Sequence, residues 1–306
     1  MKKTQVLLII IFVILAICLI LFISPIFIFR SIAIDQAQTY STQFQKAQTL
    51  STQVRAVFEG AEEQLRSITQ VMNITESDRN EQERILSSLL SEDGLYEELV
   101  LLDNTGEEQI YLSLQGTDSP ANSGNWADTD AFVKAQTTNE IYYGPVLFNE
   151  MTGEPTVVIG VPFSDANNDY VLIATLRFKK VWDLVVSTRL NRGEAIYIVD
   201  GENRVVAHRN PSVVLRGTQF EVPDEEGVYP GLEGANAVLA SDRIQLGEQE
   251  LVIVSEQPAS GIYTTTSSLV FTLAVMGIII IILVILASLG FGVAYRSFKS
   301  NQEKSQ

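Results

Sequence analysis

The sequence offers few side chains for nucleophilic or metal-dependent chemistry. It contains one histidine, His208, and one cysteine, Cys18. A zinc site needs several histidine, cysteine or carboxylate ligands, and the usual Cys–His and Ser–His templates need a base beside the nucleophile. His208 is therefore predicted to make a structural hydrogen bond rather than to bind a metal. No phosphate-binding GxxxxGK[ST] run and no HExxH motif occurs in the sequence.

The acidic residues predict no active site either. The segment Asp165–Asp169 spaces its oxygen atoms like the start of a calcium-binding loop, but Tyr170 and Leu176 stand where such a loop needs glycine and glutamate. We therefore predict a turn there. Paired acids such as Glu97 and Glu98 are most simply explained as solvated faces. The chain as given is predicted not to be an enzyme and to hold no catalytic residue, metal or cofactor.

The charge balance excludes another class of partner. The formal net charge is −16, from 37 acidic and 21 basic residues. Proteins that bind nucleic acid present a basic face, so no nucleic-acid partner is expected. The single cysteine lies within a long apolar run, so no intramolecular disulfide is possible and the fold must depend on its core.

Two apolar runs predict that the chain crosses a membrane twice. They span residues 5–29 and 267–294, and neither contains a charged residue. About 20 mostly apolar residues are enough for a transmembrane helix. The first run is too long for the apolar part of a signal peptide, and it ends without a small-residue cleavage site. We therefore predict two uncleaved transmembrane helices.

The flanks of these runs predict the orientation. Two lysines precede the first run, and basic residues outnumber acidic ones after the second. Cytoplasmic flanks carry the excess of lysine and arginine in membrane proteins. Both the N-terminus, residues 1–4, and the short tail, residues 295–306, are therefore expected in the cytoplasm, and residues 30–266 are expected to be extracytoplasmic.

The segment after the first run predicts one long helix over residues 30–75. Small or apolar residues follow a 3-4 alternation from Ala37 to Met72, with Ser51 as the only break. This stripe can pack against the sheet of its own domain, or it can pair with a second copy as a dimer stalk. Both hold if the membrane-near half pairs and the far half packs, and we expect a homodimer on this ground.

Strand patterns dominate after a second helical stretch at Glu81–Leu90. Turn sequences at Asp103–Gly106 and Asp200–Asn203 suit hairpins. Antiparallel strands backed by a long helix predict an α+β fold, in two similar modules at residues 76–186 and 187–266. The expected strands are Glu98–Leu102, Gln109–Leu114, Thr156–Val161, Tyr170–Phe178, Ala195–Val199, Arg204–His208, Ala237–Leu246 and Leu251–Ser255.

The middle region also contains seven short segments whose order and spacing are informative. They are Tyr142–Phe148, Thr152–Pro155, Val157–Pro162, Val181–Ser187, Ala195–Asp200, Arg204–His208 and Val252–Pro258. Together they resemble the double Cache sensor domains of bacterial transmembrane receptors, from about residue 95 to residue 262. The resemblance implies a membrane-distal PAS-like module with a ligand pocket, a smaller membrane-proximal module, and a location at the bacterial inner membrane.

The resemblance also implies candidate ligand-binding residues in the distal module. Family members that bind free amino acids hold the ligand carboxylate with an arginine, next to a tryptophan, and the ammonium group with an acid. Thr129, Ala131 and Thr175 stand at these three positions here, so ordinary amino-acid recognition is not expected. An aromatic, weakly polar pocket is expected instead, with Arg177 as an anion anchor if it points inward. The candidate residues are Trp126, Asp128, Phe132, Tyr142, Tyr143, Thr175 and Arg177, and core packing is the alternative role for each aromatic.

These features predict a membrane-anchored extracytoplasmic sensor. A small ligand in the distal module would shift the domain between two packings, and the second transmembrane helix would pass the displacement to a cytoplasmic output. The short tail cannot hold that output, so we expect a histidine kinase, cyclase or phosphatase on a longer chain or a separate cytoplasmic signalling partner. The alternative function is a non-catalytic membrane scaffold with a Cache-like ectodomain.

Overall fold

The computed structural model describes residues 3–71, 74–91, 94–114, 124–149, 152–166, 168–225, 227–260, 270–279 and 282. Side chains are described from residue 30 onward, except at positions 31, 32, 71 and 76. The chain divides into two compact units. One unit is Tyr40–Gln257, and the other comprises Met1–Thr39 and Pro258–Gln306.

In the second of these units the described structure is helical apart from Pro258, the last residue of a strand. Helix α1 (Lys3–Arg66) includes residues 3–39, and residues 270–279 form another helical segment. Among the described residues, no helix combines the length and the apolar character that a membrane crossing requires. The side chains of the predicted span at 5–29 lie outside the described set, as do most of the span at 267–294 and the whole tail at 295–306. The two membrane spans therefore stay predictions.

Helix α1 continues without a break into the unit Tyr40–Gln257, where one face is fully buried. Ala47, Val54, Phe58, Ala61 and Leu65 are each 0% exposed. These residues belong to the predicted stripe. Its far half therefore packs against the sheets of its own chain, which was the first of the two predicted roles of the stripe. The first residues of the stripe, Ala37, Tyr40 and Phe44, are exposed or half-buried, and Met72 lies outside the described residues.

The chain turns back after α1 through short irregular helices. A π-helical turn, η1 (Ser67–Val71), follows directly, and a 3-10 turn, η2 (Ile74–Glu76), leads to helix α2 (Arg79–Ser91). The long helix was predicted to end at residue 75, whereas the regular α-helix ends at Arg66.

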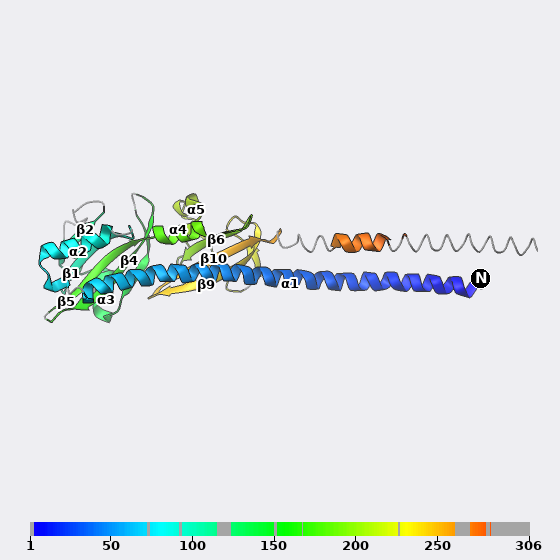
Figure 1. Ribbon diagram of the computed structural model, residues 1–306, viewed down its shortest axis with the longest axis horizontal. Coiled ribbons are helices and arrows are strands. Elements are labelled where there is room, and N and C mark those ends of the chain that lie inside the picture. The colour runs from blue at the N-terminus through cyan, green and yellow to red at the C-terminus, as the bar shows by residue number, and fades with distance from the viewer. Residues whose placement is uncertain are drawn as a thin grey trace, which may run out of the picture. The chain divides into compact units, whose positions relative to one another are not determined.

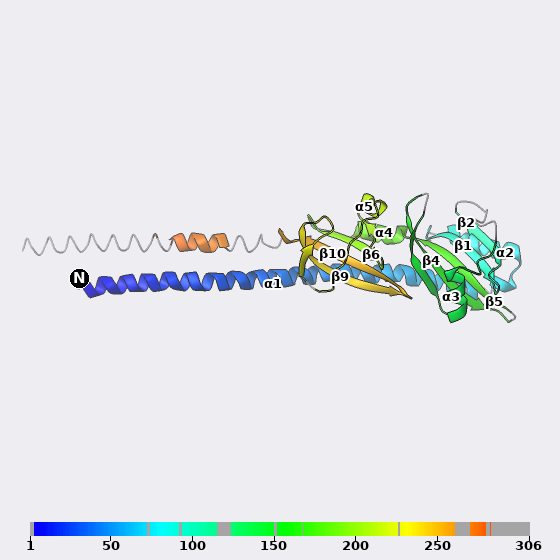
Figure 2. The same ribbon diagram turned by 180° about the vertical axis from the view of Figure 1, so that it is seen from behind.

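The distal sheet has five strands. They are β1 (Tyr96–Asp103), β2 (Glu108–Ser113), β3 (Tyr142–Phe148), β4 (Pro155–Ser164) and β5 (Asp169–Arg177), in the order β2-β1-β5-β4-β3. Neighbouring strands pair antiparallel throughout this sheet. Helix α3 (Asp130–Thr138) precedes β3 and covers one face of the sheet, while α1 and α2 cover the other (Figure 1 and Figure 2).

The proximal sheet repeats this arrangement. Helix α4 (Lys179–Ser187) leads into β6 (Ala195–Asp200) and β7 (Val205–His208), and helix α5 (Pro211–Leu215) leads into the remaining strands. These are β8 (Gly227–Pro230), β9 (Asn236–Leu246) and β10 (Gln249–Pro258). The order β7-β6-β10-β9-β8 is the distal order repeated five strands later. The predicted α+β fold, with a long N-terminal helix and two antiparallel sheets, is confirmed (Figure 2).

One apolar core runs along α1 beneath both sheets. It includes Phe58 and Ile159 at the distal sheet and Leu50 and Ile253 at the proximal sheet. Polar contacts also join the sheets. The Arg204 guanidinium donates to the Val146 carbonyl oxygen over 2.7 Å and lies 5.2 Å from the centre of the Phe148 ring. The module boundaries at residues 76–186 and 187–266 stay a prediction, with strands at 96–177 and 195–258.

Strand β10 carries a buried acid, Glu256, which is 7% exposed. Its Oε2 accepts hydrogen bonds from the Tyr197 hydroxyl (3.1 Å) and from the Leu232 backbone N–H (3.0 Å). Burial, together with the nearby acid Glu233, raises the pKa of Glu256 above its ordinary value. Gly231 lies close beside it, because a Cβ at position 231 would lie 2.6 Å from Oε2 and would displace the carboxylate.

We predict that this carboxyl makes the fold less stable as pH rises. Its pKa is raised in the folded state, so the folded chain binds its proton more tightly than the unfolded chain. The stabilisation is complete below the ordinary pKa of 4.5 and is lost as pH rises through the folded-state pKa. Melting temperatures of the wild type and of Glu256→Gln, measured from acid to neutral pH, should diverge in this window because glutamine does not ionise. Glu63→Gln, which changes an exposed acid, should follow the wild type. Parallel profiles for all three would contradict the prediction.

Candidate ligand-binding site

The alternation of β5 places four side chains on the face of the distal sheet that α3 covers. Val171 and Ile173 pack there with Phe132 of α3 in a small apolar cluster. Side chains two positions apart on a strand share a face. Thr175 and Arg177 therefore lie on this face as well, toward the end of the strand where α3 does not cover it.

Helix α3 is fixed over the sheet by its cap and by one glycine. The Thr129 hydroxyl accepts the backbone N–H of Phe132 (3.4 Å) and donates to the carbonyl oxygen of Trp126 (2.8 Å). On the strand below, Gly160 allows the Ala131 carbonyl to approach, since a Cβ at position 160 would lie 2.7 Å from that oxygen. The close approach places Phe132, 4% exposed, against the sheet.

The segment before α3 is held by the hairpin between β1 and β2. The Gly106 carbonyl accepts the backbone N–H of Trp126 over 2.8 Å. The Trp126 indole Nε1–H donates to Glu108 Oε2 over 3.3 Å. The indole thus lies between the β2 strand and the cluster under α3, which it contacts.

A carboxylate lies at the centre of the polar groups on this face. Glu98 of β1 shares the face with Val100 and accepts the Tyr111 hydroxyl over 2.8 Å and the Thr175 hydroxyl over 3.3 Å. Burial, and then the hydrogen bond from Tyr111 to Glu98, raises the pKa of Tyr111. Both donors to Glu98 in the described structure are neutral hydroxyls.

The cations on this face already have acidic partners. Arg177 pairs with Glu154 at 2.7 Å. Lys134 of α3 pairs with Glu248 at 2.6 Å, and its ammonium lies 5.5 Å from the centre of the Tyr142 ring. The arrangement therefore favours a positively charged group on a ligand at Glu98 over a negatively charged one at Arg177.

The structure separates the candidate residues into two groups. Trp126, Phe132, Tyr142 and Thr175 come together on the α3 face, with Arg177 at its edge. Two others do not join them. Asp128 is exposed in the turn before α3, and Tyr143 lies on the opposite face, where its hydroxyl donates to Glu62 of α1 over 3.0 Å. We therefore leave Asp128 and Tyr143 out of the site.

Three residues of the face were missed by the sequence analysis, namely Glu98, Glu108 and Tyr111. Glu98 was counted with Glu97 as part of a solvated pair, although a strand places adjacent residues on opposite faces. Its separation of two from the apolar Val100 was the available signal. His208, by contrast, makes the predicted structural contact, because its Nδ1 accepts the Asn210 backbone N–H over 3.0 Å.

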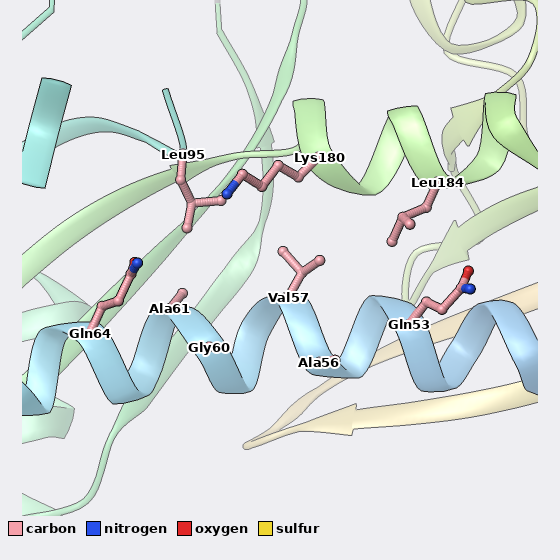
Figure 3. Close-up of a pocket in the computed structure, with 9 residues that line it drawn as sticks. All are labelled: Gln53, Ala56, Val57, Gly60, Ala61, Gln64, Leu95, Lys180 and Leu184. Atoms are coloured by element: carbon pink, nitrogen blue, oxygen red, sulfur yellow. The ribbon is translucent and has the colours of Figure 1, made fainter. Parts of the chain in front are cut away.

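A groove opens on the other side of the distal sheet, between α1 and α4. Its volume is about 440 Å³. Val57 and Leu184 point into it from the two helices, and Lys180 extends across it toward Leu95 (Figure 3). No three histidine, cysteine or acidic side chains gather as a metal site in the part of the chain that the structure describes.

Comparisons with known proteins agree with the architecture. A family model described as a Cache domain, of the dCache type, matches residues 29–266. The sensory domain of the Campylobacter jejuni chemoreceptor Tlp3 (CcmL) is similar at a TM-score of 0.60 and 13% identity, covering 76% of this chain and 99% of that one. The ligand-binding domain of the Pseudomonas aeruginosa PAO1 amino acid chemoreceptor PctC, in complex with GABA, is similar at 0.58 and 11%, covering 72% and 100%.

A third solved structure, also from a chemoreceptor, has a similar fold. The periplasmic sensory domain of the Campylobacter jejuni chemoreceptor Tlp1 has a TM-score of 0.58 and 13% identity, covering 75% of this chain and 98% of its own. At these identities the likeness shows the fold alone. No curated protein matches the sequence.

Proposed function

The chain belongs to the double Cache family, and from this premise we propose that it is a membrane-anchored sensor whose distal module binds a small molecule outside the cytoplasm. Binding changes the packing of the module, and the second predicted span passes the displacement to a cytoplasmic output.

One observation carries the proposal. The α3 face of the distal sheet gathers aromatic and polar side chains from four separate segments, including Glu98, Tyr111, Trp126 and Thr175. Ligand sites combine apolar walls with a few convergent polar groups. The solved structures of the same fold are sensory or ligand-binding domains of chemoreceptors, which supports a similar role here.

The ligand we propose is a small organic amine with an apolar body. Thr129 and Ala131 provide no arginine for a carboxylate, and Arg177 is paired with Glu154. Glu98 offers a carboxylate to an ammonium group, and aromatic rings nearby attract cations through their faces.

Replacing Glu98 by glutamine is expected to weaken amine binding by roughly 10- to 100-fold. A hydrogen bond to a charged group contributes about 1.5–3 kcal/mol, and glutamine keeps the shape while removing the charge. The measurement is calorimetric titration of the full chain in detergent with the amine that most raises its melting temperature in a panel of amines and carboxylates. Glu97→Gln is the matched control, because its carboxylate accepts from Asn149 away from Tyr111 and Thr175.

Two outcomes would contradict this assignment. Equal weakening by the two glutamine variants would remove Glu98 from the site. A panel in which no compound raises the melting temperature would favour the scaffold function over sensing.

We further propose that α1 contributes to a homodimer through its membrane-near half. Tyr40 and Phe44 stack with ring centres 6.3 Å apart and are only half-buried within one chain, and Ala37 is exposed. The partial exposure of these side chains leaves apolar surface for a second copy of the chain to cover. This agrees with the prediction that the membrane-near half of the stripe pairs in a dimer.

A further inference from the structure

A fully buried amide interrupts the apolar face of α1. Gln43 is 0% exposed, and its side chain makes three hydrogen bonds. Its Oε1 accepts the Ser255 hydroxyl over 2.6 Å. Its Nε2 donates to Glu194 (2.9 Å) and to Gln257 (3.0 Å). We call Gln43, Glu194, Ser255 and Gln257 the Gln43 cluster. It joins α1 to the last strand of the proximal sheet and to the loop before the first.

The Glu194 carboxylate is itself buried and charged. Its side chain is 1% exposed, and the Lys46 ammonium lies 2.5 Å away, one turn along α1 from the Gln43 side chain. The Asn191 backbone N–H adds a bond of 2.6 Å. Burial alone would raise the pKa of Glu194, but the bonds from Lys46, Asn191 and Gln43 lower it below its ordinary value.

A second polar contact lies farther along the same face of α1. The buried hydroxyl of Ser51, the residue that breaks the apolar stripe, donates to Asp242 of β9. Gln43 and Ser51 thus bind different strands of the proximal sheet from two points on one helix.

These contacts depend on the axial position of the helix in a way that apolar packing does not. Apolar contacts are non-directional, so they constrain the axial position of α1 only through the shapes of the packed side chains. The same shift would place Thr39 or Ala47 where Gln43 lies. Ser255, Glu194 and Gln257 would then lose their bonds to Gln43, and for the fully buried Ser255 hydroxyl this loss is costly. A single buried polar residue is known to specify register between helices.

We propose that the Gln43 cluster fixes the axial register of α1 against β10, so that the helix and the last strand move as one body when the distal module responds to its ligand. The inference rests on the proposed sensing function. It assigns the movement to the distal strands relative to this body, and excludes sliding of α1 along the proximal sheet.

The register is measured by the distance between two spin labels on the full chain in detergent. The natural cysteine is removed by Cys18→Ser, and labels are attached at exposed positions through Gln48→Cys on α1 and Asn236→Cys on β9. One narrow distance distribution is expected, and it should stay unchanged when the amine from the panel is added. In Gln43→Leu a second population is expected, displaced by up to about 5 Å, the length of one helical turn.

Two further variants distinguish register from general loosening. Leu50→Ala removes a buried apolar side chain from the same face but leaves the cluster intact, and it should keep the single distribution. Ser255→Ala removes one hydrogen bond of the cluster and should give a smaller second population than Gln43→Leu. It tests the proposal in place of Gln43→Leu if that variant does not fold.

Three results would overturn the proposal. The first is a single narrow distribution in both Gln43→Leu and Ser255→Ala. The second is a second population in Leu50→Ala as large as that in Gln43→Leu. The third is a shift of about one helical turn when the amine from the panel is added to the labelled chain without these substitutions. The comparison of variants needs no ligand, so it stands apart from a failure of the sensing function itself.

Discussion

Replacing Phe58 by alanine is expected to lower the free energy of unfolding by about 3–5 kcal/mol, the range measured for large aromatic truncations in cores. Phe58 is 0% exposed. Its ring meets Tyr143 of β3 and Phe178 at the start of α4 edge-on, with centres 6.4 and 6.1 Å apart. The loss would therefore open a cavity where the long helix, the distal sheet and the connection to the proximal sheet meet.

Urea denaturation of the full chain, followed by circular dichroism, measures this effect. Phe44→Ala is the control, because Phe44 is the same residue type on the same helix but only half-buried within one chain. It should cost much less in the monomer. Equal losses for Phe58→Ala and Phe44→Ala would show that burial in the core of one chain does not set the stability of this helix.

Replacing Gly106 by alanine is expected to weaken ligand binding by about tenfold or more and to destabilise the distal module by about 1–3 kcal/mol. The backbone at Gly106 has φ +81°, which disfavours a side chain, and an added Cβ would lie 2.6 Å from the Ala127 backbone nitrogen. The segment that carries Trp126 would have to move. The indole would then leave its place beside Glu108 on the ligand face.

Gly94 provides a matched control for backbone strain. It also has positive φ, +59°, but an added Cβ would meet nothing within 4 Å. Gly94→Ala should cost about 1–2 kcal/mol of stability through strain and leave the affinity for the amine unchanged. Calorimetric titration and thermal melting of both variants separate the two effects. Wild-type affinity in a folded Gly106→Ala chain would show that the Trp126 segment takes no part in binding.

Most strands could be predicted because alternation in a sheet with covered faces is a local property of the sequence. The strand predicted at Thr156–Val161 has β-branched residues at nearly every position, and it lies within β4 of the structure. The helices α3 and α4 were not predicted as helices. Each has nine residues, too few to establish a 3.6-residue period, and each is stabilised by packing on a sheet that the sequence does not display.

The candidate site was harder to predict because it depends on which face each strand presents. Tyr142 and Tyr143 are adjacent in sequence and equally aromatic, yet only Tyr142 faces α3. The irregular register after Tyr143 makes that choice depend on the partner strand. Arg177 was predicted as an anion anchor, but in the structure it pairs with Glu154. The two residues are 23 positions apart in sequence, so the pair depends on the fold.

The repeated strand order has a consequence for how the protein is made. In both sheets the strand synthesised last, β5 or β10, occupies the central position between two hairpins. Until that strand is present, each pair of hairpins exposes two unpaired inner edges, which are sites for misassociation of the incomplete chain. The distal sheet is complete in a chain that reaches Arg177, whereas the proximal sheet needs a chain that reaches Pro258. A polypeptide cut short within the final strand would therefore lose the middle of its second sheet rather than an edge.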